Sequence, residues 1–101
     1  MAVRTAHSPD GTQVTIAVNG RFDFTVHEQF RVAYERSPKV ANRYVVDLSA
    51  TEYVDSSPLG MLLLLREHAG GHADRVSIKG ARPEVKRVLT IANFHKLFAL
   101  A

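Results

Sequence analysis

Residues 44–71 read YVVDLSATEYVDSSPLGMLLLLREHAGG and join two apolar elements through a short polar segment. Residues 44–48 are nearly continuously apolar and rich in strand-forming types, which predicts a central strand buried on both faces. Residues 53–54 continue extended after a short interruption. A helix is expected over residues 58–69, ending at two glycines, and its residues 61–65 are apolar around most of the helical circumference, which predicts a deeply buried helix.

The polar segment between these elements contains an aspartate, two serines and a proline at 55–58. Proline disfavours the α conformation in the preceding residue and suits the first helical position, so we expect Ser57 to be the N-cap and Ser56 to lie just outside the helix. There the hydroxyl of Ser56 would be exposed near four free amides and the positive end of the helix dipole, a position that suits a phosphate. The same residue types also serve ordinary capping, so the pattern alone leaves both interpretations open.

Strand-like and helix-like segments alternate along the rest of the chain. Thr25 and Glu28 have the spacing of a capping box, which predicts the start of the first helix, and Pro38 predicts its end. The other expected elements are an edge strand over 2–6, strands over 13–18 and 75–79, a helix over 83–93 and a short helical turn over 94–100. This order predicts an α/β fold with a mixed sheet of four to five strands and about four helices.

The 101 residues are 46% hydrophobic, which predicts one domain over 1–101 with a single core. The absence of cysteine excludes disulfides, thiolate metal sites and thiol catalysis. The longest apolar run, 59–65, is much shorter than the ~20 residues of a membrane-spanning helix. The first eleven residues lack the apolar stretch of a secretory signal, so we expect a cytoplasmic protein with no membrane partner.

The segment DLS at 47–49 is followed by YVDSSPLG at 53–60. These motifs resemble the signature of STAS domains, the anti-sigma factor antagonists of bacteria. NGRFD at 19–23 resembles the turn before the first helix of that family. Residues 83–89 resemble its third helix and residues 94–98 its closing segment. The resemblance covers about residues 12–100 and implies a single STAS-like domain.

The resemblance implies a non-enzymatic switch that needs no cofactor and no metal. In that family the serine after the motif aspartate is phosphorylated by a partner that is both a serine kinase and an anti-sigma factor, and a PP2C-type phosphatase reverses the modification. Ser56 would therefore be the phosphoacceptor, presented by Asp55. The unphosphorylated form, a monomer when free, would bind the anti-sigma factor and release a sigma factor. The expected partner-binding residues are Asp23, Phe24, Asp55, Ser56, Ser57, Pro58 and Leu59.

Pro58 departs from the family pattern, which usually has glycine or alanine at this position. Proline removes a backbone amide that could contact a phosphate, and it stiffens the serine pair. The substitution therefore leaves Ser57 as an alternative phosphoacceptor to Ser56.

Two other classes of function remain open. The domain could be a scaffold or regulator that binds another signalling enzyme, for example in biofilm or motility control, under the control of Ser56. It could also be an enzyme or small-ligand binder at the strand–helix edge. Asp55 is adjacent to Ser56, but residues 55–60 contain no histidine that could act as the base, which argues against a hydrolase.

The remaining charged residues indicate no further chemistry. We do not expect direct nucleic-acid binding, because the basic residues are scattered rather than gathered on one face. The one dense group is Lys79, Arg82, Lys86 and Arg87. His68 and His72 are separated by two glycines that should break the helix, so they do not predict a metal site. Asp23 is expected to hold a turn and Asp47 to end a strand.

Overall fold

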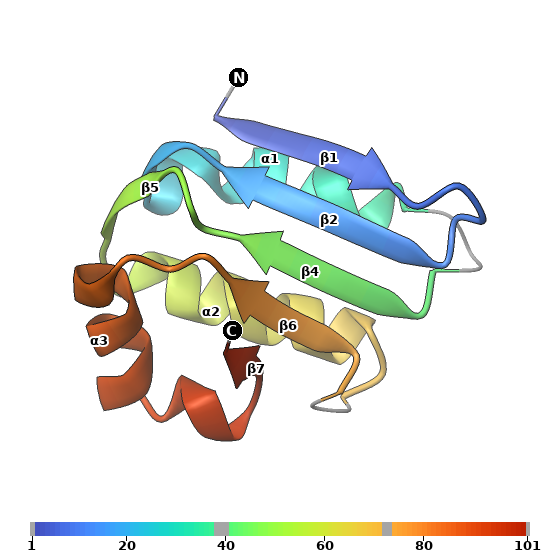
Figure 1. The fold of residues 1–101 in the computed structure, drawn as a ribbon. Helices are drawn as coiled ribbons and strands as arrows, with labels where there is room; N and C mark the ends of the chain where they lie inside the picture. Colours follow the sequence, from blue (N-terminus) through green and yellow to red (C-terminus); the bar gives the residue numbers. More distant parts are fainter. Residues whose placement is uncertain (1, 38–40, 72–73, 101) are drawn as a thin grey trace.

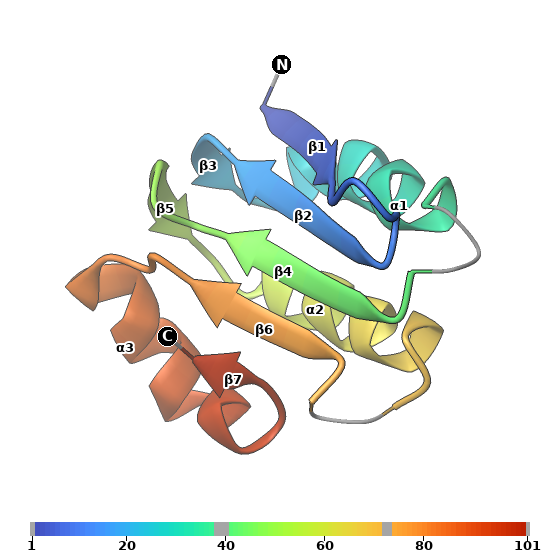
Figure 2. The same cartoon turned by 45° about the vertical axis from the view of Figure 1, so that its right-hand side comes forward.

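The computed structural model describes residues 2–37, 41–71 and 74–100 and shows a sheet with two helices against one face (Figure 1). The strands of the main sheet lie in the order β1-β2-β4-β6-β7. Helices α1 and α2 cover the same face, and α3 lies beyond β6 (Figures 1 and 2). The elements are β1 (Val3–His7), β2 (Gln13–Val18), β3 (Gly20–Phe22), η1 (Phe24–Val26), α1 (His27–Glu35), β4 (Arg43–Asp47), β5 (Thr51–Val54), α2 (Ser57–His68), β6 (Val76–Lys79), α3 (Pro83–Ile91), η2 (Phe94–Lys96) and β7 (Ala99–Leu100).

The predicted α/β fold with a mixed sheet is confirmed. β1 pairs antiparallel with β2, whereas β2, β4, β6 and β7 are mutually parallel neighbours. The described residues form five strands in the main sheet, three α-helices and two short 3-10 helices, close to the expected content. Parallel neighbours need crossover connections, which α1, α2 and, between β6 and β7, α3 supply.

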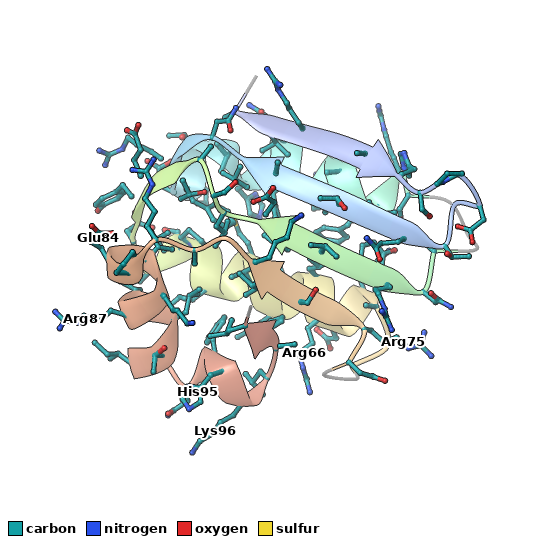
Figure 3. The ribbon with its side chains drawn as sticks, viewed as in Figure 1. Arg66, Arg75, Glu84, Arg87, His95 and Lys96 are labelled. Carbon is teal, nitrogen blue, oxygen red and sulfur yellow. The ribbon has the colours of Figure 1, made fainter. Side chains whose placement is uncertain are left out.

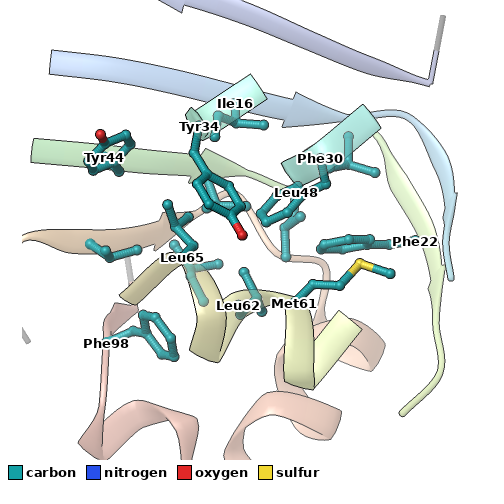
Figure 4. Packing of buried hydrophobic residues seen from close by; sticks show 14 of the residues in the cluster. Ile16, Phe22, Phe30, Tyr34, Tyr44, Leu48, Met61, Leu62, Leu65 and Phe98 are labelled. Atoms are coloured by element: carbon teal, nitrogen blue, oxygen red, sulfur yellow. The ribbon is translucent and has the colours of Figure 1, made fainter. Parts of the chain in front are cut away.

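The core lies between the sheet and the two helices (Figure 4). Ile16 of β2 and Leu48 after β4 face Met61, Leu62 and Leu65 of α2, and all five side chains are buried. The burial predicted for α2 was too strong: Leu63 and Leu64 are 42% and 49% exposed, because the helix packs on one side only. The central strand β4 is buried on both faces, as predicted, because its consecutive residues 44–46 are all buried, although helices lie against only one face.

The first helix begins differently from the prediction. Asp23, not Thr25, is the capping residue: its carboxylate accepts a hydrogen bond from the Thr25 amide at 3.0 Å. That cap starts the 3-10 turn η1, and α1 follows without a side-chain cap. The predicted capping box of Thr25 and Glu28 was therefore wrong, because the Thr25 amide donates to the carboxylate of Asp23, two residues upstream. α1 ends at Glu35, and Pro38 lies outside the described residues.

A two-stranded ribbon of β3 and β5 stands beyond the ends of β2 and β4 (Figure 2). The sequence indicated an extended segment at 53–54 but not its pairing with the three residues of β3. Thr51 joins the ribbon to the main sheet. Its side chain is fully buried, and its hydroxyl donates a 2.7 Å hydrogen bond to the Val18 carbonyl.

Replacing Thr51 with valine should lower the free energy of unfolding by about 1–3 kcal/mol. Valine fills the same space but leaves the Val18 carbonyl without the hydroxyl it now accepts from. Urea unfolding followed by circular dichroism measures the change. Thr51→Ser, which keeps the hydroxyl, is the matched control. Equal stability of the valine variant and the parent protein would show that this bond does not anchor the ribbon.

Candidate functional site

The candidate site lies where the β3–β5 ribbon ends. Phe22 and Val54 are paired in register, so Asp23 and Asp55 leave the same end of two parallel strands. One strand continues into η1 and the other into α2. The fold thus brings together the two segments, around Asp23 and around Ser56, that the sequence analysis had placed on one surface.

Asp55 fixes the start of α2. Its Oδ1 atom accepts a 2.9 Å hydrogen bond from the Ser57 amide, and the helix begins at Ser57. The prediction of Ser57 as N-cap was therefore wrong by one residue. The carboxylate of Asp55 closes the turn before the helix, and Pro58 suits the first turn because an amide is not needed there. Ser56 occupies the N-cap position without a side-chain capping bond.

The hydroxyl of Ser56 is exposed, as predicted, but the four free amides expected beside it are not all available. The Ser57 amide is bonded to Asp55, and position 58 is a proline without an amide. The Leu59 amide donates to the Ser56 carbonyl at 3.3 Å. The start of α2 therefore offers a group on Ser56 much less hydrogen bonding than an ordinary helix N-terminus.

Asp23 holds the turn that precedes α1, as expected. Besides the Thr25 amide, it accepts from the Thr25 hydroxyl and, at 3.3 Å, from the Arg21 guanidinium. The hydroxyl and amide of Thr25 hold the pKa of Asp23 below its usual value. Arg21 also lies over the Tyr53 ring, 4.2 Å from its centroid. These contacts fix the backbone that presents Phe24.

Phe24 stands at the edge of an apolar groove between η1, α1 and α2. Its side chain is 70% exposed and stacks on the His27 ring, with centroids 5.5 Å apart. The groove has a volume of about 490 Å³. We call it the α1–α2 groove, and its lining residues are Phe24, His27, Ser57, Gly60, Met61 and Leu64.

The structure thus brings the predicted residues Phe24 and Ser57 to one groove and places Ser56 at the adjoining helix start. Pro58 is buried, and Leu59 packs against the core. Sequence analysis missed the contribution of His27 and of the α2 residues after Leu59. The sequence signal for the α2 residues was the helical spacing of Ser57, Gly60, Met61 and Leu64, which places them on one face of the helix.

His27 is a possible base that the sequence argument overlooked, because it lines the α1–α2 groove together with Ser57 but is distant from it in sequence. Within the described residues no hydrogen bond joins its ring to Ser56 or Ser57, and the ring is stacked on Phe24 instead. The described part of the chain also contains no cluster of three or more metal-ligating side chains. His68 packs against Tyr34, with ring centroids 4.9 Å apart, and His72 lies outside the described residues.

The other charged residues take the places expected of them. Asp47 ends β4, and its carboxylate accepts a 2.9 Å hydrogen bond from the Ser49 amide. The cationic side chains Arg75, Arg87 and Lys96 project outward at separate places (Figure 3). In the part of the chain that the structure describes, the helices are too short or too polar to cross a membrane.

A family model described as "Mlab, STAS domain" matches residues 5–100. The chain belongs to the STAS family. A STAS-domain containing protein from Pseudomonas aeruginosa (strain UCBPP-PA14) is 50% identical over 101 residues and is matched over the full length of both chains.

The STAS fold is also evident from solved structures. The unphosphorylated anti-sigma factor antagonist SpoIIAA matches with a TM-score of 0.82 and 19% identity, over 99% of this chain and 88% of that one. An anti-sigma factor antagonist from Mycobacterium paratuberculosis matches with a TM-score of 0.74 and 21% identity, over 97% and 84% of the two chains. The fold of this STAS domain is therefore that of the anti-sigma factor antagonists.

Proposed function

We propose that this STAS domain is an anti-sigma factor antagonist controlled by reversible phosphorylation of Ser56. In its unphosphorylated form it binds an anti-sigma factor that is also a serine kinase, and a sigma factor is released. A PP2C-type phosphatase removes the phosphate. The observation that carries the proposal is the exposed Ser56 hydroxyl at the start of α2, beside the α1–α2 groove.

The site suits a binding switch better than catalysis. A kinase needs a reachable hydroxyl, and Ser56 offers one on a backbone held by Asp55. The partner needs an apolar surface, which Phe24 and Leu64 provide. Exposed aromatic side chains beside a groove are typical binding anchors. In this proposal the domain is a cytoplasmic monomer when free and acts without a cofactor.

A phosphate on Ser56 would act mainly through its charge at the partner surface. It adds about −1.5 to −2 charges at neutral pH. Because Asp55 already uses the Ser57 amide and Pro58 has none, the domain itself can compensate little of that charge. The phosphate therefore stays in solvent when the domain is free. On binding, it would have to be desolvated against an apolar surface, which is costly unless a cation meets it.

Isolating the protein from its own cells and mapping its phosphate by tandem mass spectrometry tests this proposal. We expect one phosphate, located on Ser56, that disappears in a Ser56→Ala variant and persists in a Ser57→Ala variant. A phosphate that maps to Ser57 would mean that Pro58 has changed the acceptor. No phosphate under several growth conditions would favour a constitutive scaffold or regulator of another signalling enzyme.

A further inference from the structure

The outer edge of β1 is open. Among the described residues β1 is the last strand of the main sheet on its side, and no strand pairs with its outer edge. Proteins usually protect such edges by short length, bulges, proline or charged side chains, and the one arginine of β1, Arg4, lies on the face away from the groove-lining residues Val3 and Thr5. The opposite edge strand, β7, has only two residues. β1 has five residues without proline, and its register with β2 is continuous.

The hydrogen bonds of β1 show which backbone groups face outward. The Asn19 amide donates to the Ala2 carbonyl, and the Ser8 amide donates to the Gln13 carbonyl. Antiparallel pairs alternate between hydrogen-bonded and non-hydrogen-bonded positions. When this alternation is counted from either of the two bonds, the non-hydrogen-bonded positions opposite β2 are Val3, Thr5 and His7. Their amides and carbonyls therefore point away from β2, toward the open edge.

An apolar groove runs beside these free backbone groups. It lies between β1 and α1, has a volume of about 260 Å³ and is distinct from the α1–α2 groove. Its lining residues are Val3, Thr5, Glu28, Gln29, Val32 and Ala33. Directly opposed residues on neighbouring strands point to the same face of a sheet. A residue opposite Thr5 on an added strand would thus place its side chain in this groove, against Val32.

We infer that the β1 edge binds an extended segment of a partner protein as an additional strand. The apolar groove calls for an apolar side chain opposite Thr5. Glu28, 79% exposed at the rim, favours a lysine or arginine two positions away on the same face of that segment. Its ion pair with Arg31, 3.5 Å away, is exposed and weak, so Glu28 can exchange partners.

A second copy of the chain fits this surface less well. Antiparallel pairing of two β1 strands about Thr5 would place threonine opposite threonine and His7 opposite Val3. Neither pairing puts an apolar side chain opposite Thr5, and the register that would put Val3 there uses a side chain that is already buried in its own domain. The occupant is therefore a strand of a different protein, and its binding does not depend on the state of Ser56.

The probe is a capped peptide, Thr-Lys-Thr-Val-Thr-Lys-Thr, titrated into isotopically labelled protein and followed by NMR. We expect saturable shifts of the Val3, Thr5, His7 and Val32 amides. Methylation of the valine nitrogen in the peptide removes a hydrogen bond to β1 without changing the protein. It should weaken binding roughly tenfold or more. Shifts that map elsewhere, or none at millimolar peptide, would overturn the inference.

Protein variants separate backbone pairing from groove contacts. Thr5→Pro removes an outward amide that β2 does not use, and Val32→Glu places a charge in the groove; each should weaken binding roughly tenfold. If the proline variant fails to fold, the glutamate variant and the methylated peptide still decide. Arg4→Ala, on the opposite face of β1, should leave binding unchanged. Equal affinity in all variants, or concentration-dependent shifts of the edge amides without peptide, would contradict the inference.

Discussion

Phosphoserine at position 56 is expected to weaken binding of the anti-sigma factor about a hundredfold, a change of roughly 3 kcal/mol in binding free energy. The reason is local. The new charge lies beside Asp55 at the end of an apolar groove, and the first turn of α2 has few free amides to meet it. Isothermal titration calorimetry, with phosphoserine introduced during translation, measures the effect without requiring the kinase to act.

Matched variants show whether the charge or its position is responsible. Ser56→Ala should bind as the parent protein does, because the free hydroxyl makes no bond within the part of the chain described. Ser49→Asp adds a charge on an exposed turn outside the groove and should change affinity less than about threefold. Unchanged affinity of the phosphoserine protein would contradict the charge mechanism. If NMR shows instead that the core of the phosphoserine protein is rearranged, the switch is conformational rather than electrostatic.

The layers of the fold could be predicted from sequence because they depend on periodicity. The alternation in β2 and the apolar run in β4 follow directly from the residue pattern, and the apolar run at 61–65 predicts α2 but not which of its sides faces the core. The first residues of α1 and α2 could not be predicted from sequence, because each helix start depends on one carboxylate. Asp23 and Asp55 each capture a backbone amide two residues later, and several polar residues near each start offered equally good caps.

Only part of the candidate site could be predicted from sequence, for a similar reason. Asp55, Ser56 and Ser57 are adjacent in sequence, so one motif identifies them together. The groove beside them is built by packing: Phe24 and His27 reach Met61 and Leu64 only because β3 pairs with β5. A three-residue strand carries too little pattern to predict that pairing. The functional surface thus depends on the element that the sequence identifies least well.

Two phenylalanines separate folding from binding at this surface. Phe22 is fully buried and contacts Phe30, with ring centroids 5.3 Å apart, whereas Phe24 is 70% exposed. Phe22→Ala should lower the free energy of unfolding by about 3–5 kcal/mol, because it empties a closely packed position. Phe24→Ala should change stability by less than about 1 kcal/mol, since little of its ring is removed from water. Thermal unfolding of both variants measures the difference.

For binding of the anti-sigma factor, we expect Phe24 to matter more than Phe22. Phe24→Ala should weaken binding of the anti-sigma factor roughly thirtyfold, about 2 kcal/mol, if the ring is an anchor of the partner surface. Calorimetric titration well below the melting temperature of each variant is the measurement, with Ile91→Ala as an exposed apolar control on α3. If the Phe24→Ala variant binds the anti-sigma factor as tightly as the parent protein does, the α1–α2 groove is not part of the interface. Because Asp23 fixes the turn between the two rings, Asp23→Ala should weaken binding through the loss of that geometry while both phenylalanines remain.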